Sequence, residues 1–362
     1  MLNLPQTTPE CLFVGEGRSD LVGIGIIVGF VGQATISLCL ALWAFFFSTS
    51  GFLDGHHHPD SVEFEIEQKR LECVSDILMV GNDIQMVIGT SYMISVFSSA
   101  GTISTYHLHL AFDIVSFVGV SSAAALVCWT YCTLRLHQTS SSSPDYASHL
   151  LSRHIPCLRS VHFTPRHRGT YLFAALYLVL TILLGLSLDA WNPDAQPGRC
   201  YLAHLVTHPQ ASHPAADKVY VAFTAAWMLL VMLAAALSSA RWRHSILALA
   251  FLQFPVHLYM ALALRAANQG HLEGDDAREN RWDFGQTTAV VLLAMAAREL
   301  FDKGTEFYFF ERELRKRGAL LPSNSNNSNG SSSKRMKKSR DGRNNGDYCH
   351  SRELRGVSGV GA

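Results

Sequence analysis

Charged residues are scarce in this sequence. Asp, Glu, Lys and Arg make up 16% of it, hydrophobic residues make up 48%, and the formal net charge is zero. A soluble domain of this length would not collect its apolar residues into separated blocks that are long enough to cross a bilayer. A net charge of zero also gives no indication of nucleic-acid binding, for which an excess of basic residues is typical. Composition therefore indicates an integral membrane protein that has the lipid bilayer, and no nucleic acid, as a partner.

Motifs for cofactors and metals are also missing. No Gly-x-Gly-x-x-Gly element follows a strand pattern, the cysteines form no Cys-x-x-Cys pair, and no apolar block carries a histidine cluster at metal-ligand spacing. Asp275, Asp276 and Glu279 have the spacing of a magnesium-binding Asp-Asp-x-x-Glu motif. Gly and Asn flank them, so we interpret this segment as a solvated acidic loop. We expect neither a cofactor nor a metal.

Long apolar blocks are what the sequence has instead. A helix needs about 20 apolar residues to cross about 30 Å of hydrocarbon. Blocks of this kind lie near residues 21–48, 74–97, 104–131, 169–190, 218–239, 244–265 and 284–301. We therefore expect an all-α, polytopic membrane bundle of about seven transmembrane helices. The bundle is predicted to cover residues 1–317, and the Ser-, Asn-, Gly- and Lys-rich residues 318–362 are predicted to form a disordered tail.

Basic residues fall in alternate connections between these blocks. They precede the second block, crowd the connection between the third and fourth, join the fifth to the sixth and recur in the tail, whereas the connection before the seventh is acidic. By the positive-inside rule the amino terminus is then non-cytosolic and the carboxyl terminus cytosolic. Cys11 and Cys200 share the non-cytosolic side in this topology, and a disulfide between them is allowed there.

The second apolar block contains several polar residues. Ionisable groups in hydrocarbon cost at least about 2.5 kcal/mol each, so they are expected to face the bundle interior and to be functional. Asn82, Gln85, Gly89 and Tyr92 form one helical stripe, and Asp83 lies beside it. Asp83 is about nine residues from the predicted cytosolic end of the block, or about 13 Å at 1.5 Å per residue. Its carboxylate is predicted to approach the midplane.

The third block carries a second polar face. Tyr106, His109, Asp113 and Ser116 share this face, while His107 points elsewhere. The short connection between the second and third blocks makes them antiparallel neighbours, and Asp113 then lies about 13 Å in from the opposite side. A desolvated carboxyl group at that depth is a candidate proton donor. Alternatively, the aspartates of both blocks hold the two helices together through hydrogen bonds.

The sixth block holds a weaker polar signal. Gln253 and His257 flank Pro255 one helical turn apart. Polar side chains commonly satisfy the backbone groups that a proline frees in a transmembrane helix. We therefore interpret this pair as the polar support of a proline kink.

Three segments together resemble a large family of filamentous-fungal integral membrane proteins. In members of that family the second span carries a Ser/Asn-Asp-x-Gln element followed by Gly, the third begins Ser-x-Tyr-His, and the last begins Trp-x-Phe-Gly-Gln. The corresponding segments here are Asn82-Asp83-Ile84-Gln85 with Gly89, Ser104-Thr105-Tyr106-His107 and Trp282-Asp283-Phe284-Gly285-Gln286. The chain departs from the family pattern at Asp113, where many members have Tyr, and at Leu108, where Trp is usual.

The family includes membrane-bound terpene cyclases of fungal meroterpenoid pathways, similar to those of the ascofuranone and macrophorin routes. The resemblance implies an isomerase- or lyase-type enzyme of secondary metabolism. Such an enzyme cyclises, by protonation, a farnesyl chain attached to a lipophilic polyketide-derived ring. It also implies a location in the endoplasmic reticulum or another endomembrane, and a prenyltransferase and a monooxygenase as pathway partners.

Cyclisation by protonation needs a dry acid, an apolar cavity, aromatic faces that stabilise cations, and a base that takes up the last proton. Asp83 or Asp113 is the expected acid, and a histidine is expected to orient the acid or act as the base. The remaining expected catalytic residues are Gln85, His107 and His109. The expected substrate-binding residues are Tyr92, Tyr106, Phe112, Phe117 and Trp129.

Two other functions remain open. A seven-helix receptor or sensor has this topology, although the third block ends without an acidic-Arg-aromatic triplet and the seventh lacks an Asn-Pro-x-x-Tyr element. A proton-coupled transporter uses intramembrane Asp and His to relay protons. Transporters usually contain internal repeats with broken helices, and the sequence shows none.

Overall fold

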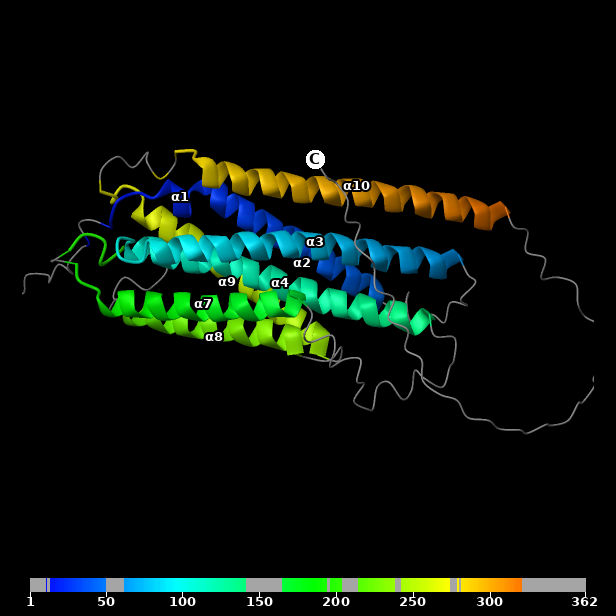
Figure 1. Cartoon of the computed structure of the whole chain (residues 1–362), viewed down its shortest axis with the longest axis horizontal. Helices are drawn as coiled ribbons and strands as arrows, with labels where there is room; N and C mark the ends of the chain where they lie inside the picture. The colour runs from blue at the N-terminus through cyan, green and yellow to red at the C-terminus, as the bar shows by residue number, and fades with distance from the viewer. Residues whose placement is uncertain are drawn as a thin grey trace, which may run out of the picture. The chain divides into compact units, whose positions relative to one another are not determined.

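The computed structural model describes residues 11, 14–49, 62–140, 165–193, 196–203, 214–237, 242–273, 279 and 281–320. Regular structure within these residues is helical. The helices are α1 (Ser19–Val22), α2 (Ile24–Thr49), α3 (Val62–Ser98), α4 (Thr105–Ser140), α7 (Pro165–Asp189), α8 (Ala215–Leu237), α9 (Arg243–Asn268) and α10 (Phe284–Leu320) (Figure 1). The chain divides into two units, Met1–Ala319 and Leu320–Ala362, and these helices belong to the first up to Ala319. Of the tail predicted from residue 318 onward, residues 318–320 extend α10, and residues 321–362 lie outside the described part of the chain.

Among the described residues, six helices are long and apolar enough to cross a membrane. These candidate spans are Ser19–Ala44, Val62–Ser98, Thr105–Thr133, Arg166–Asp189, Ala215–Leu237 and Arg243–Asn268. The protein is therefore all-α in its described part and is a multi-pass membrane protein in a lipid bilayer. The seventh predicted block forms the first half of α10, but it falls short of the others in hydropathy because Gln286, Arg298 and Glu299 interrupt its apolar residues.

Helix α4 lies at the centre of the bundle. The apolar window of its span is 100% buried within the protein, whereas the window of α7 is 33% buried. It packs against α2, α3, α7, α8 and α9. Small residues allow this close approach, since a Cβ atom at Gly119 would lie 2.6 Å from the sulfur of Met228 on α8. Every polar side chain on the buried part of α4 must therefore find its partners inside the protein.

Glycines bring α2 and α10 together. A Cβ atom at Gly29 would lie 2.7 Å from the Cβ atom of Ala289, and the Gly25 amide donates to Oε1 of Gln286 at 3.0 Å. Gly32 approaches Leu293 one helical turn further along. This spacing of small residues is typical of closely packed transmembrane helices, and it places the first half of α10 against a membrane-spanning helix.

The segment before α1 is tied to the ends of other helices. A disulfide joins Cys11 to Cys200, with 6.0 Å between their Cα atoms, so the pairing that the sequence allows is present. The Glu273 amide donates to the Gly15 carbonyl at 2.9 Å, which brings this segment onto the chain that follows α9. Gly15 has a φ of 114° and lies against Ser104, where a side chain would clash. These ties close one end of the bundle.

Candidate active site

The polar face predicted for α4 is present. Tyr106, His109, Asp113 and Ser116 are all buried, and Asp113 has no exposed surface. An aspartate side chain that is buried between helices needs hydrogen-bond donors from those helices. The contacts of this carboxyl group therefore define the site.

Asp113 meets residues of two other helices. The Tyr220 hydroxyl, from α8, donates to Oδ1 of Asp113 at 2.9 Å. Nδ1 of His257, from α9, lies 2.8 Å from the same oxygen and 3.2 Å from the Tyr220 hydroxyl. The three side chains form a compact triangle in the protein interior, and we call Asp113, His257 and Tyr220 the acid triad. A proton within the triad can move between a carboxylate, an imidazole and a phenol.

The second imidazole neighbour of the carboxyl group is His109. Its Nε2 lies 3.9 Å from Oδ2 of Asp113, and its Nδ1 lies 2.7 Å from the hydroxyl of Tyr201. Burial, together with the nearby carboxylate of Asp217, raises the pKa of Tyr201 well above its ordinary value of 10, so this hydroxyl stays protonated at neutral pH. The predicted pairing of His109 with Asp113 along α4 is thus present, and Tyr201 extends the polar chain.

Gln253 fixes the ring of His257. Its Nε2 donates to the Thr224 carbonyl at 3.1 Å and lies 3.3 Å from Nε2 of His257. An amide that donates to Nε2 leaves the imidazole proton on Nδ1, the atom that faces Asp113. The Gln253 and His257 pair beside Pro255, which the sequence indicated as the support of a kink, therefore orients a site residue as well.

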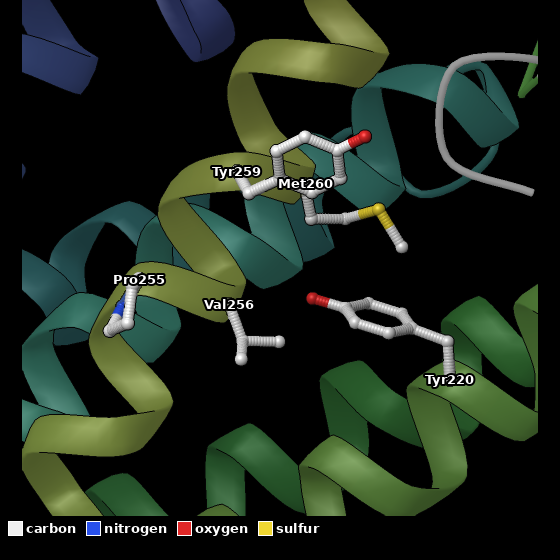
Figure 2. A pocket seen from close by; sticks show the side chains of 5 residues that line it. All are labelled: Tyr220, Pro255, Val256, Tyr259 and Met260. Atoms are coloured by element: carbon white, nitrogen blue, oxygen red, sulfur yellow. The ribbon is translucent and has the colours of Figure 1, made fainter.

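A pocket of about 420 Å³ opens beside the triad (Figure 2). It is lined by Tyr220 from α8 and by Pro255, Val256, Tyr259 and Met260 from α9. Tyr259 is 60% exposed and Val256 is 36% exposed, so the pocket faces outward between two candidate spans. Tyr220 alone belongs to both the triad and this lining. An apolar ligand in the pocket would thus lie against the phenol that contacts Asp113.

Aromatic rings surround the triad on its inner side. Phe112 stacks on Tyr177 with 5.3 Å between ring centroids, and it lies 5.9 Å from the ring of His257. Phe117 contacts Phe254 at 5.4 Å between ring centroids, about one turn after Asp113 on α4 and one turn before His257 on α9. The structure therefore brings two of the predicted substrate-binding residues, Phe112 and Phe117, to the neighbourhood of Asp113.

Asp83 lies elsewhere, and its predicted inward, midplane position is corrected. Its side chain is 48% exposed and is paired with Arg166 at 3.2 Å between Oδ2 and Nη2. Arg166 stands in the first turn of α7, so Asp83 is level with the end of a neighbouring span. The physical reason is that α3 extends back to Val62, beyond the level at which α7 begins, so position along α3 does not mark where the bilayer starts. The first turn of α7 is the better marker, and it lies level with Asp83.

The predicted stripe of α3 is buried, as expected, but its side chains contact α4 and α1 and do not belong to the acid triad. Oε1 of Gln85 accepts a hydrogen bond from Ser121 of α4 at 2.5 Å. The Tyr92 hydroxyl donates to the Leu21 carbonyl at 2.7 Å. Asn82 is 3% exposed. Two of the expected site residues, Gln85 and Tyr92, thus join α3 to α4 and to α1.

His107 and Tyr106 belong to a separate polar cluster. Nδ1 of His107 lies 2.6 Å from the Ser104 hydroxyl, and its Nε2 lies 3.7 Å from a carboxylate oxygen of Glu279. Tyr106 donates to the same carboxylate at 3.3 Å, and Nη1 of Arg265 lies 4.0 Å from it.

Glu279 has no exposed surface, so its interpretation as part of a solvated acidic loop is wrong. The buried carboxylate is compensated by these donors. Asp275 and Asp276 lie outside the described residues.

Trp129 lies far from the triad along α4. Its ring contacts the ring of His167 in the first turn of α7 at 6.0 Å. The 16 residues between Asp113 and Trp129 correspond to about 24 Å of helix. Trp129 therefore marks the opposite end of the bundle from the pocket.

Sequence reasoning missed the residues that complete the site. Tyr220, Tyr177 and Tyr201 come from three separate segments, and nothing in their local sequence singles them out. His257 was recognised as an intramembrane polar residue, and its position one turn after Gln253 was the available signal. Their partners on α4, which are Asp113 for Tyr220 and His257, Ser116 for Tyr177 and His109 for Tyr201, become apparent only when the helices are packed.

Within the described ranges, no group of three or more His, Cys, Asp or Glu side chains is placed to hold a metal ion. Comparison of the chain with protein-family models, with curated proteins and with solved structures gives no match. Function must therefore be argued from the geometry of the triad and its pocket.

Proposed function

We propose that this protein is a membrane-bound terpene cyclase that cyclises the farnesyl chain of a lipophilic meroterpenoid-type substrate by protonation. The observation that carries the proposal is the acid triad beside an outward-facing apolar pocket. Asp113 is wholly buried, Tyr220 and His257 contact one of its oxygens, and Tyr220 also lines the pocket. The triad thus offers a proton donor to a ligand that remains in the membrane.

The chemistry of the triad suits such a reaction. A carboxyl group without water access can hold a proton, and a neighbouring imidazole can take up the proton that the final carbocation releases. The rings of Tyr220 and Tyr259 line the pocket, and the π faces of aromatic rings stabilise carbocations. Cyclisation does not change the elemental composition of the substrate. The protein therefore needs only to donate one proton at the start of the reaction and to accept one at its end.

The pocket suits a substrate that arrives through lipid. Tyr259 and Val256 are exposed on the outer surface of α9, where acyl chains would contact them in a bilayer. An apolar chain can enter there without crossing water, and its polyketide-derived ring can remain near the polar end of the helices. A prenyltransferase and a monooxygenase in the same membrane would supply the prenylated and oxidised substrate.

The topology completes the proposal. Packing of Gly25, Gly29 and Gly32 against the first half of α10 supports α10 as a seventh span. With seven spans, the basic connections and tail face the cytosol and the amino terminus lies on the other side. Asp113 is then about 12 Å, and Tyr220 about 8 Å, from the non-cytosolic ends of their helices at 1.5 Å per residue. An endomembrane location, such as the endoplasmic reticulum, follows from the expected pathway partners.

The test is conversion of substrate by membranes that contain the protein. Microsomes from a fungal host expressing the chain are incubated with farnesylated phenols and their terminal epoxides, and products are separated by liquid chromatography with mass detection. The expected result is a new peak of unchanged mass that microsomes from the empty host do not form. No new peak across the panel, with the protein present at normal level in the membrane, contradicts the proposal.

A proton-coupled transporter is the second candidate, because of one specific observation. His109, Tyr201 and Asp217 extend the triad toward the first turn of α8 as a buried chain of titratable groups. Such chains relay protons in pumps and transporters. Proteoliposomes separate the two functions, since a transporter acidifies or alkalises the lumen when its substrate is added, and a cyclase changes the substrate without moving protons.

A further inference from the structure

The wall of the pocket contains no atom of Asp113 or His257. Its lining consists of Tyr220, Pro255, Val256, Tyr259 and Met260. Asp113 and His257 have no exposed surface, whereas Tyr220 is partly exposed. In Figure 2 the Tyr220 side chain extends from α8 toward Val256 and Met260 on α9. A ligand in the pocket therefore meets the phenol before it can reach the carboxyl group.

We infer that the hydroxyl of Tyr220 donates the proton to the substrate. Asp113 and His257, which lie behind Tyr220, hold the replacement proton, and we call these two residues the proton store. This inference rests on the proposed cyclase function and assigns the catalytic donor within it. Tyr220 contacts the store on one side, at 2.9 Å from Asp113 and 3.2 Å from His257, and the pocket on the other.

The geometry accommodates both proton arrangements that the transfer needs. In the loaded form Asp113 carries the proton and donates it to the Tyr220 oxygen, so the phenol hydrogen is free to point into the pocket. In the spent form the phenol donates to the Asp113 carboxylate, which also accepts from Nδ1–H of His257. A separation of 2.9 Å between the two oxygens suits a hydrogen bond in either direction. Only hydrogen positions change between the two forms.

The step balances as an isomerisation. The phenol hydrogen forms a bond to the oxygen of a terminal epoxide, the carbon–oxygen bond breaks, and the neighbouring alkene supplies the electron pair for the new carbon–carbon bond. Asp113 gives its proton to the Tyr220 oxygen in the same step. The last carbocation then loses a proton, which the Tyr220 oxygen accepts as the phenol returns its own hydrogen to Asp113. The protein ends in its starting protonation state, and the product has the mass of the substrate.

A phenol donor also selects the kind of substrate. A phenol is a weak acid, and protonation of an isolated alkene carbon requires a much stronger one. An epoxide oxygen, by contrast, accepts a hydrogen bond before its ring opens. Donation through Tyr220 therefore predicts conversion of the terminal epoxide of a farnesylated phenol and no conversion of the parent alkene.

The substitution Tyr220→Phe tests the inference, because it removes the hydroxyl and keeps the ring that lines the pocket. Tyr308→Phe is the control, since Tyr308 is an exposed tyrosine of α10 that belongs to neither the triad nor the pocket. Expected is a loss of at least about 100-fold in kcat for Tyr220→Phe with KM changed less than about threefold, and turnover within about threefold of wild type for Tyr308→Phe. Replacement of Tyr220 by 3-fluorotyrosine, which keeps a hydroxyl, should restore turnover. A packing defect would instead persist in that variant or lower the thermal midpoint of Tyr220→Phe.

The outcomes separate the inference from the proposed function. Epoxide conversion that survives in Tyr220→Phe but is lost in Asp113→Asn overturns the inference and leaves the cyclase proposal standing. Conversion of the alkene by the wild-type protein also overturns the inference alone. Absence of any conversion by wild-type membranes overturns the cyclase proposal, and the inference falls with it.

Discussion

The two aspartates that the sequence places at similar depth have opposite environments. Asp113 has no exposed surface and is in contact with His257 and Tyr220, whereas Asp83 is 48% exposed and is paired with Arg166. Both lie on long helices that pack against each other. The difference shows that the neighbours of a helix, and not the number of residues from its end, decide what an intramembrane carboxylate can do.

The partners explain the contrast. An exposed carboxylate beside an arginine forms a surface ion pair, and such pairs contribute little to stability. A buried carboxyl group beside an imidazole and a phenol can exchange a proton without exchanging it with water. We therefore assign the proposed acid role to Asp113 and a surface role to Asp83.

The largest expected effect is on turnover at Asp113. Asp113→Asn keeps the shape of the side chain and removes its acid, so the rate of product formation should fall by about 10²- to 10⁴-fold. Asp83→Asn is the matched control and should change the rate by less than about twofold. Both are measured as initial rates per amount of membrane-inserted protein. Equal losses in the two variants would mean that the contrast between the aspartates has no bearing on catalysis.

The next effect in size is on stability. Loss of the Cys11–Cys200 disulfide, in Cys11→Ser with Cys200→Ser, should lower the free energy of unfolding by about 2–5 kcal/mol, because the bond closes a loop that spans 189 residues of sequence. The thermal midpoint in detergent measures this loss. Cys73→Ser serves as the control, because Cys73 lies in the first half of α3 and forms no disulfide. An unchanged midpoint in the double variant would show that the end of the bundle nearest the triad is held by other contacts.

A smaller effect separates the two histidine clusters. His257→Gln removes the imidazole that orients Asp113 and should reduce kcat by about 10- to 100-fold. His107→Gln alters the cluster of Ser104 and Glu279, so it should lower the thermal midpoint while kcat of the folded fraction stays within about threefold of wild type. Steady-state kinetics with a parallel thermal melt distinguishes the two. The reverse pattern would move the active site to the cluster around Glu279.

The smallest effect is expected at the surface pair. Arg166→Ala leaves Asp83 with solvent or lipid headgroups, and an exposed ion pair contributes about 0–1 kcal/mol. The thermal midpoint and turnover should both remain close to wild-type values. A drop in turnover comparable to that of Asp113→Asn would contradict the surface role of Asp83.

Much of the fold could be predicted from the sequence, because span-length apolar blocks and helical periodicity are local signals. The buried faces of α3 and α4 appear in the structure as predicted, from Asn82 to Tyr92 and from Tyr106 to Ser116. The start of α3 was missed because its first turns are too polar to register as a span, although Glu63 and Glu65 suit the beginning of a helix.

The site was only half predictable, for a different reason. Asp113 and His109 stand four residues apart on one helix, so periodicity brings them together. Tyr220 and His257 reach Asp113 from helices more than 100 residues later in the chain, as the separations of 107 and 144 residues show. The burial of Glu279 likewise depends on Tyr106, His107 and Arg265 from other elements. Contacts of this kind depend on how helices pack, which no local pattern encodes.

Photo-crosslinking tests most directly whether the acid triad, and not the surface around Asp83, is where the substrate binds. A farnesylated phenol with a diazirine near the end of its chain is irradiated with wild-type membranes, and labelled peptides are mapped by mass spectrometry. Labels on α8 and α9 near Tyr220 and Met260, displaced by excess unlabelled substrate, are the predicted result. Displaceable labels confined to α3 and α7 near Asp83 and Arg166 would contradict the account.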